Sequence, residues 1–209
     1  MKKNKKNILN KALELFNDFG YTSVSIRQIA SEIGISHSNL IYHYKTKNDI
    51  AIALHQELLV KALELNKTTI HNPNFIESLF DSTKKGFEIL YQYRFLMIDF
   101  NSILRENEKL KQIILEVENI RATMYRNAIN QAVKQGYMRE REYDNEYDSL
   151  ILTIKIFSDS WISSSEIYET IPSQEIIEKY SSLFVKLFFP FLTEKGKKVF
   201  LLMLDRESA

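Results

Sequence analysis

The stretch SVSIRQIASEIGISHSNLIYHYK, residues 23–45, contains two helix starts in succession with a glycine between them. At the first start, Ser25 stands at the capping position and Gln28 follows three residues later, which is the spacing of a capping box. Val24 and Ile29 are spaced to pack around that cap as a hydrophobic staple. Gly34 then ends the helix and permits a tight turn. The pattern predicts a short, well-bounded helix over residues 26–33.

The same pattern repeats at once, because Ser36 can cap a second short helix whose first residues are polar. A helix, a three-residue turn and a second helix with a polar front are typical of a helix-turn-helix, in which the second helix enters the major groove of DNA. We therefore predict that this segment and its flanks contact double-stranded DNA. The candidate contact residues are Ser25, Gln28, Ser36, His37, Ser38, Asn39, Tyr42, His43 and Lys47.

The remainder of the chain also has helical spacing, so the predicted fold class is all-α. The 209 residues include only five glycines and three prolines. Pro190 is expected to kink or interrupt the last predicted helix. The charged run over residues 139–148 is expected to be a solvated connection between helices. The predicted helices span about 5–19, 26–33, 36–44, 47–65, 75–93, 95–105, 108–135, 144–169 and 173–204.

The composition excludes several kinds of site. The chain has no cysteine, so disulfides, thiolate metal sites and cysteine nucleophiles are excluded. The four histidines, His37, His43, His55 and His71, form no i, i+4 pair and lie in no zinc motif. No nucleophile–base pair stands out either. We predict no metal site, no cofactor and no enzymatic activity.

Charge and hydropathy are unevenly distributed along the chain. Residues 1–49 carry eight cations and four acids, a net charge of +4, whereas the whole chain carries +1. A basic segment on a nearly neutral chain favours a polyanionic partner. The most apolar stretch, residues 183–192, contains Lys186 and Pro190. It is too short to cross a bilayer, which needs about 20 apolar residues. We expect a cytoplasmic protein with no membrane contact.

Residues 5–58 contain a set of features that occur together in a known family. They are the Ala12-Leu13-Phe16 stripe, Gly20-Tyr21, Ile26 with Ile29-Ala30, Gly34-Ile35-Ser36, Leu40, Tyr42-His43-Tyr44 and Lys45-Thr46-Lys47. With these features the segment resembles the N-terminal DNA-binding domain of the TetR family of bacterial transcriptional repressors. Two positions depart from the family pattern. Ile41 stands where family members usually carry tyrosine, and Ser38 stands where glycine is frequent.

The resemblance implies a division of the chain and a homodimer. Residues 1–48 would form a three-helix helix-turn-helix domain, and residues 49–209 a larger helical domain that binds an effector and dimerises. A helix beginning near residue 47 would connect them. In this family the last two long helices dimerise, which here implies residues 144–169 and 173–204. Large apolar residues in the last segment fit such an interface or an intramolecular core. The interface candidates are Phe184, Leu187 and Phe188.

Aromatic residues and methionines gather in the middle of the chain. They fit an apolar cavity for a small, apolar or amphipathic effector, and they equally fit a filled core, because helical spacing does not distinguish the two. The pocket candidates are Phe87, Tyr91, Phe95, Phe100, Met124, Phe157 and Trp161.

The combined prediction is a DNA-binding transcriptional regulator, a repressor that a small-molecule effector releases from its operator. Two alternatives remain open from the residues. One is a helix-turn-helix protein with no effector response, which predicts a filled core in place of a cavity. The other is a helical enzyme acting on a small molecule, which requires a catalytic constellation that the sequence does not display.

Overall fold

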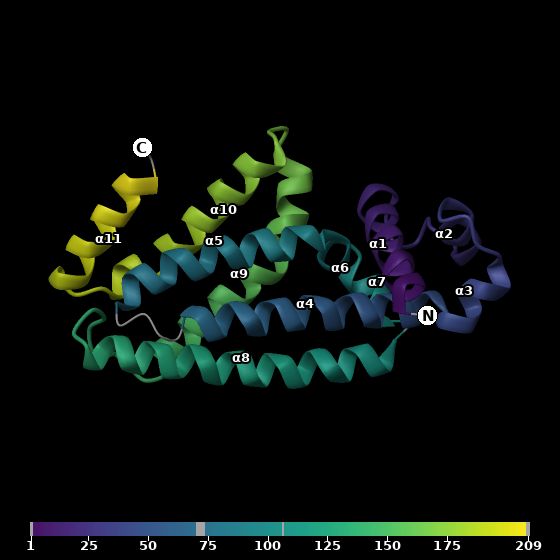
Figure 1. The fold of residues 1–209 in the computed structure, drawn as a ribbon. Helices are drawn as coiled ribbons and strands as arrows, with labels where there is room; N and C mark the ends of the chain where they lie inside the picture. Colours follow the sequence, from purple (N-terminus) through teal and green to yellow (C-terminus); the bar gives the residue numbers. More distant parts are fainter. Residues whose placement is uncertain (1, 70–73, 106, 208–209) are drawn as a thin grey trace. The chain divides into compact units, whose positions relative to one another are not determined.

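The structure is a computed structural model that describes residues 2–69, 74–105 and 107–207. The described residues are helical apart from connections and one isolated bridge between Met138 and Leu192, which confirms the all-α prediction (Figure 1). The helices are α1 (Lys2–Phe19), α2 (Ile26–Glu32), α3 (His37–His43), α4 (Lys47–Thr69), α5 (Phe75–Gln92), α6 (Arg94–Ile98), α7 (Phe100–Arg105), α8 (Glu108–Lys134), α9 (Glu146–Tyr168), α10 (Ser173–Lys186), the 3-10 helix η1 (Phe189–Phe191) and α11 (Glu194–Glu207).

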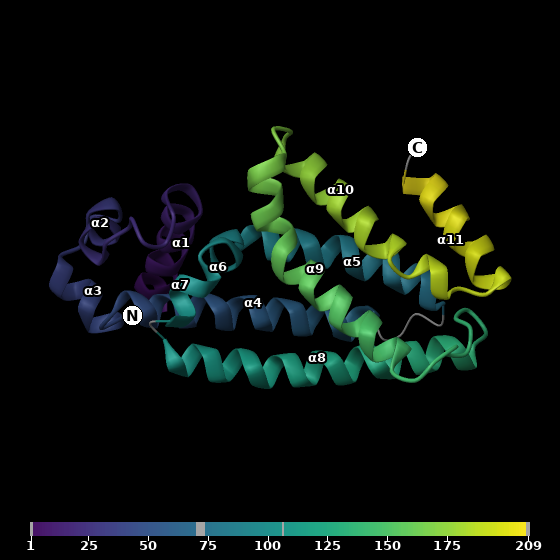
Figure 2. The same cartoon turned by 180° about the vertical axis from the view of Figure 1, so that it is seen from behind.

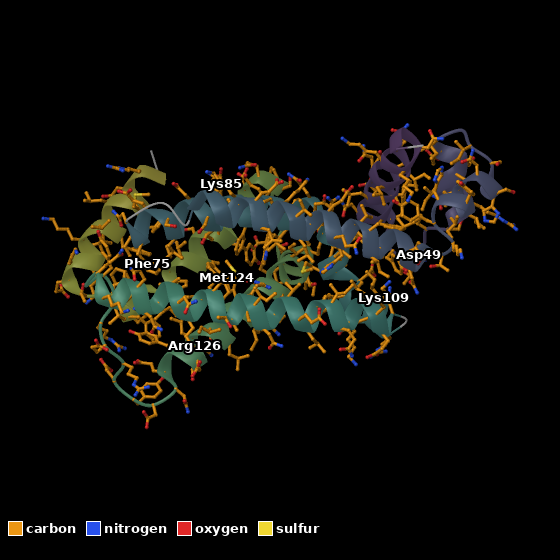
Figure 3. All side chains as sticks on the ribbon, turned by 60° about the horizontal axis from the view of Figure 1, so that its bottom comes forward. Asp49, Phe75, Lys85, Lys109, Met124 and Arg126 are labelled. Atoms are coloured by element: carbon orange, nitrogen blue, oxygen red, sulfur yellow. The ribbon has the colours of Figure 1, made fainter. Side chains whose placement is uncertain are left out.

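The short helices begin at the predicted caps. The Ser25 and Ser36 hydroxyl oxygens each accept a hydrogen bond from the backbone N–H three residues on, at 3.2 Å. Thr46 and Asp49, the latter labelled in Figure 3, form a reciprocal capping box at the start of α4, with bonds of 2.9 and 3.1 Å. These local bonds satisfy N–H groups that a helix start leaves without partners.

Two of the predicted helices are divided in the structure. The segment expected as one helix over 95–105 forms α6 and α7, which meet at Asp99. The Asp99 carboxylate accepts a hydrogen bond from the Tyr21 N–H at 2.7 Å. Because Tyr21 lies 78 positions earlier, no local sequence pattern indicates this contact. The segment over 173–204 forms α10, η1 and α11, and Pro190 lies in η1 as the predicted interruption requires.

The chain divides into two compact units. Unit 1 comprises residues 1–61 and 89–114, and unit 2 comprises residues 62–88 and 115–209. Residues 89–114 therefore pack with the helix-turn-helix, although the sequence placed them in the second domain. The core of unit 1 joins α1–α4 to α6 and α7. In it, the Phe95 ring lies 5.0 Å from that of Phe16 and 6.4 Å from that of Tyr21.

Unit 2 is built around aromatic rings from α5, α9 and α10, and Figure 2 shows α9 beside α10. Phe87 stacks on Trp161 with ring centroids 4.7 Å apart. Phe184 lies 5.4 Å from Phe87 and 5.9 Å from Phe157, and Tyr180 lies 5.6 Å from Trp161. We call these five residues the aromatic cluster. Its rings contact one another directly, as in a close-packed core.

The connection between α8 and α9 is more ordered than the sequence suggests. Arg139 donates two hydrogen bonds to the Glu146 carboxylate, at 2.6 and 2.9 Å, and the Glu142 N–H donates a third at 2.8 Å. Glu146 is only 3% exposed. The Arg139 guanidinium lowers the pKa of Glu146 to about 2, because it stabilises the charged form. The expectation of a solvated connection is therefore wrong at Glu146.

The same connection docks on the segment between η1 and α11. The Arg139 N–H donates to the Phe191 carbonyl at 2.9 Å, and the Thr193 N–H donates to the Tyr137 carbonyl at 3.0 Å. Gly196 packs so closely that a Cβ atom there would lie 2.2 Å from the Tyr137 carbonyl oxygen. Only glycine, which has a hydrogen in place of Cβ, therefore fits at this position near the start of α11.

Candidate nucleic-acid interface

The helix α3 presents one buried and one exposed face. Leu40 has no exposed surface and anchors α3 on α1 and α2. Ser38, Asn39 and Tyr42 are exposed, and Tyr42 is 73% exposed. The ring of His43 lies edge-on to that of Tyr42 with centroids 5.3 Å apart. The outer face therefore offers exposed hydroxyl and amide groups and a partly exposed imidazole.

The turn between α2 and α3 holds the two helices at a fixed angle. Gly34 adopts a φ of +69°, which favours glycine. Its N–H donates to the Ser31 carbonyl at 3.1 Å, and the Ile35 N–H donates to the Ala30 carbonyl at 3.0 Å. These bonds close the end of α2 and set the direction in which α3 begins. The predicted helix-turn-helix is thus present.

The capping residues keep a donor for an outside partner. Ser25 and Ser36 are exposed, and each hydroxyl oxygen accepts a backbone N–H. A serine hydroxyl also carries one hydrogen, which it can donate while the oxygen accepts. Gln28 follows on α2, and His37 opens α3, both partly exposed. The exposed hydroxyls at the starts of α2 and α3 remain available to donate to a phosphate oxygen.

The structure corrects the role expected for Lys47. Its ammonium donates hydrogen bonds to the backbone carbonyls of Tyr21, Thr22 and Val24, at 2.7, 3.4 and 3.1 Å. It also lies 4.3 Å from the centre of the Tyr21 ring. An ammonium has three N–H donors, and all three are directed at the chain itself. Lys47 therefore ties α4 to the turn between α1 and α2, and it is withdrawn as a phosphate contact.

The turn between α1 and α2 is held from two sides. From α4, Lys47 binds its carbonyls, and the Asn48 side-chain oxygen accepts a hydrogen bond from the Tyr21 hydroxyl. From the end of α6, Asp99 accepts the Tyr21 N–H. Asn17 adds a further link, since its amide donates to the Gln92 carbonyl at 2.9 Å and accepts from the Phe95 N–H at 3.1 Å. The sequence did not reveal Asn17, Asn48 or Asp99, because their partners lie 27 to 78 positions away.

The expected pocket residues do not form one group. Tyr91, Phe95 and Phe100 belong to unit 1, and Phe95 fills the core beside Phe16. The others belong to unit 2, where Phe87, Phe157 and Trp161 are part of the aromatic cluster. Met124 lies on α8 in the same unit (Figure 3). Phe95 is therefore removed from the pocket candidates.

The expected interface residues are largely covered by their own chain. Phe184 is 4% exposed within the aromatic cluster, and Phe188 is 3% exposed beside Phe184 and Phe75. Leu187 is partly exposed. Since a buried side chain has no surface to offer a partner, Phe184 and Phe188 belong to the intramolecular core, which was the alternative considered for them.

Other kinds of site are not apparent in the part of the chain that the structure describes. No group of three or more His, Cys, Asp or Glu side chains gathers there as metal ligands. Within the same residues, every helix falls short of the length and apolarity needed to span a membrane. His55 is buried on α4, and burial lowers its pKa to about 4, whereas His71 lies outside the described residues.

Comparisons with known families match nearly the whole length. The family model described as "Bacterial regulatory proteins, tetR family" matches residues 8–54. The model described as "Bacterial transcriptional repressor", named TetR, matches residues 56–200. The HTH-type transcriptional regulator RutR of Escherichia coli is 38% identical over 55 residues, which cover 26% of each chain. The chain therefore spans about a quarter of the length of this curated relative.

Solved structures share the fold over nearly the whole chain. A TetR-family transcriptional regulator from Marinobacter aquaeolei matches with a TM-score of 0.85 and 22% identity, covering 97% of this chain and 98% of that one. A transcriptional regulator from Saccharomonospora viridis, solved in complex with choline, matches with a TM-score of 0.73 and 17% identity, covering 93% and 100%. At these identities the likeness concerns the fold.

Proposed function

The chain belongs to the TetR family of bacterial transcriptional regulators, and from this premise we propose that a homodimer binds a pseudo-palindromic operator with one α3 in each half-site. The observation that carries the proposal is the exposed polar face of α3 on a capped helix-turn-helix. Regulators of this family bind DNA and small effectors, and they are generally not enzymes. We further propose that a small effector releases this protein from the operator.

The proposed contacts divide by chemistry. His37, which is partly exposed, and the exposed Ser38 and Asn39 form the first turn of α3, and in a helix-turn-helix this turn meets base edges in the major groove. Amide and hydroxyl groups can bond those edges. Tyr42 and His43 follow on the same helix and are assigned to phosphates, which position the protein without reading the sequence. Ser25, Gln28 and Ser36 are likewise assigned to phosphates.

Replacing Tyr42 by phenylalanine is expected to weaken operator binding about tenfold, because a hydrogen bond to a charged phosphate contributes roughly 1.5 kcal/mol. Stability should be unchanged, since Tyr42 is 73% exposed. Fluorescence anisotropy with DNA from upstream of the protein's own gene, at two salt concentrations, measures the effect. Tyr143→Phe is a matched control, because Tyr143 is 59% exposed and lies on the α8–α9 connection. Equal affinities of wild type and Tyr42→Phe would contradict the assigned contact.

For the dimer, we propose a surface on α9. At 3.6 residues per turn, one stripe of this helix between Ser149 and Ile167 carries no charged residue. Leu152, Ile156 and Ile167 on it are 56%, 58% and 73% exposed. Small residues between them allow another helix to approach closely. The stripe consists of Ser149, Leu152, Thr153, Ile156, Ser160, Ser163, Ser164 and Ile167. A second copy of the chain would cover these apolar side chains.

For the effector, we propose the aromatic cluster with Met124 as the binding region, in which a bound ligand would separate rings that pack together in the structure. A regulator of the same fold was solved with the small molecule choline, which supports a small ligand here. Trp161 lies in the cluster and is the one tryptophan of the chain, so its fluorescence reports on this region. A compound that lowers operator affinity is expected to change Trp161 emission with the same concentration dependence. An effector that released the DNA while leaving the emission constant would bind elsewhere.

A further inference from the structure

Helix α3, the recognition helix of the proposed function, carries one aliphatic side chain that the protein leaves partly open to solvent. Ile41 is 36% exposed on α3. The partly buried apolar residues that pack on the unit 1 core include Ile33, Ile35 and Tyr44 on either side of it. Among the residues that the structure describes, Ile41 is absent from that set. Just over a third of the Ile41 side chain is therefore open to a partner.

The position of Ile41 on α3 is set by helix geometry. At 100° per residue, Ile41 projects about 40° from His37 and about 60° from Ser38 around the helix axis, one turn further along. Leu40, on the buried face, projects about 100° away from Ile41. Ile41 thus extends the face formed by His37 and Ser38, two of the three residues that the proposed function assigns to base edges. The distance along the axis from His37 is about 6 Å, so the next base pair is within reach.

The chemistry of this side chain limits its partner. Isoleucine has no hydrogen-bonding group, so it cannot bond a phosphate or the polar edge of a base. The 5-methyl group of thymine is an apolar group displayed in the major groove, and apolar side chains contact it there. Isoleucine is also branched at Cβ, which leaves one strongly preferred rotamer in a helix. A rigid apolar side chain at this place is suited to one fixed contact.

We propose that Ile41 packs against the 5-methyl group of a thymine in each half-site, and so makes α3 select a thymine at that position. The inference rests on the proposed binding of operator DNA through α3. It also gives a role to a position where the family pattern has tyrosine. A tyrosine hydroxyl can bond a phosphate, whereas isoleucine replaces that bond by a contact with a specific base.

The test compares thymine with uracil, which differ only in the 5-methyl group. The wild-type protein first selects duplexes from a randomised library, and the consensus duplex is then synthesised as the probe. Each thymine is replaced by deoxyuridine, one symmetric pair at a time. Affinities are measured by fluorescence anisotropy for wild type, Ile41→Ala and the control Ile120→Ala. Ile120 is an exposed isoleucine on α8, outside the helix-turn-helix.

The expected result is one thymine position per half-site at which deoxyuridine weakens wild-type binding about fourfold per methyl group, or about 0.8 kcal/mol. At that position Ile41→Ala should bind both duplexes equally, while Ile120→Ala should retain the wild-type difference. The inference is overturned if no thymine shows the effect, or if Ile41→Ala retains it, and operator binding itself would still stand. Failure to select any sequence would overturn the proposed function together with the inference.

Discussion

Replacing Lys47 by alanine is expected to lower the free energy of unfolding by about 2 kcal/mol and to weaken operator binding roughly tenfold. The Lys47 ammonium bonds three backbone carbonyls of the turn between α1 and α2. Hydrogen bonds to a charged group contribute about 1.5–3 kcal/mol, and carbonyls left without a donor add a penalty. Because α2 begins directly after this turn, its loosening reduces the population in which α3 is correctly placed.

Two measurements separate this role from a phosphate contact. Chemical denaturation followed by circular dichroism gives the stability, and anisotropy over a series of salt concentrations gives the salt dependence of binding. A phosphate contact would reduce the salt slope by about one and leave stability unchanged. The bonds from Lys47 to the turn predict the reverse: lower stability with an unchanged salt slope of binding. Lys45→Ala serves as the stability control, because Lys45 lies two positions earlier and is exposed.

Replacing Ile156 by glutamate is expected to convert the proposed dimer to a monomer and to weaken operator binding more than a hundredfold. The substitution places a charge in the middle of the uncharged stripe on α9, where dimerisation would bury it without a partner. In a dimer, binding of one recognition helix holds the second at a high effective concentration beside its own half-site. A monomer loses this gain. Folding should be unaffected, since Ile156 is 58% exposed in the single chain.

Sedimentation or light scattering measures the mass, and anisotropy measures the binding. The matched control is Ile120→Glu, because Ile120 is 57% exposed but lies on α8 outside the stripe. The control should remain dimeric with wild-type affinity. A dimeric Ile156→Glu protein would rule out the α9 stripe as the interface and direct attention to other exposed apolar residues, such as Leu201 and Leu202 on α11.

The helix-turn-helix could be predicted because its determinants are local. Ser25 and Ser36 bond N–H groups three residues away, and Gly34 adopts its unusual backbone angle within the turn itself. Such features depend on residue type and short spacing, which a sequence displays directly. Pro190 likewise interrupts the last segment for a local reason, the missing N–H and the fixed φ angle.

The sequence-based predictions that differ from the structure depend on contacts between residues far apart in the sequence. The spacing of Lys47 suited a phosphate contact, but a long flexible side chain can turn toward the protein, and its partners lie 23 to 26 positions away. Asp99 divides a predicted helix while its side chain bonds Tyr21, 78 positions earlier. Phe184 is a large apolar residue of the kind found in dimer interfaces, but it packs inside the aromatic cluster. Apolar spacing identifies a buried face without identifying which surface buries it.

The close approach at Gly196 has a consequence for recognising relatives of this protein. Any side chain at this position would meet the Tyr137 carbonyl, a backbone atom that cannot rotate away. A homologue that docks its α8–α9 connection on α11 in the same way must therefore also have glycine here. Glycine at the aligned position, with a hydroxyl residue matching Thr193 three positions before it, would mark the chains that share this docking. A larger residue there would mark members of the family whose last helix begins differently.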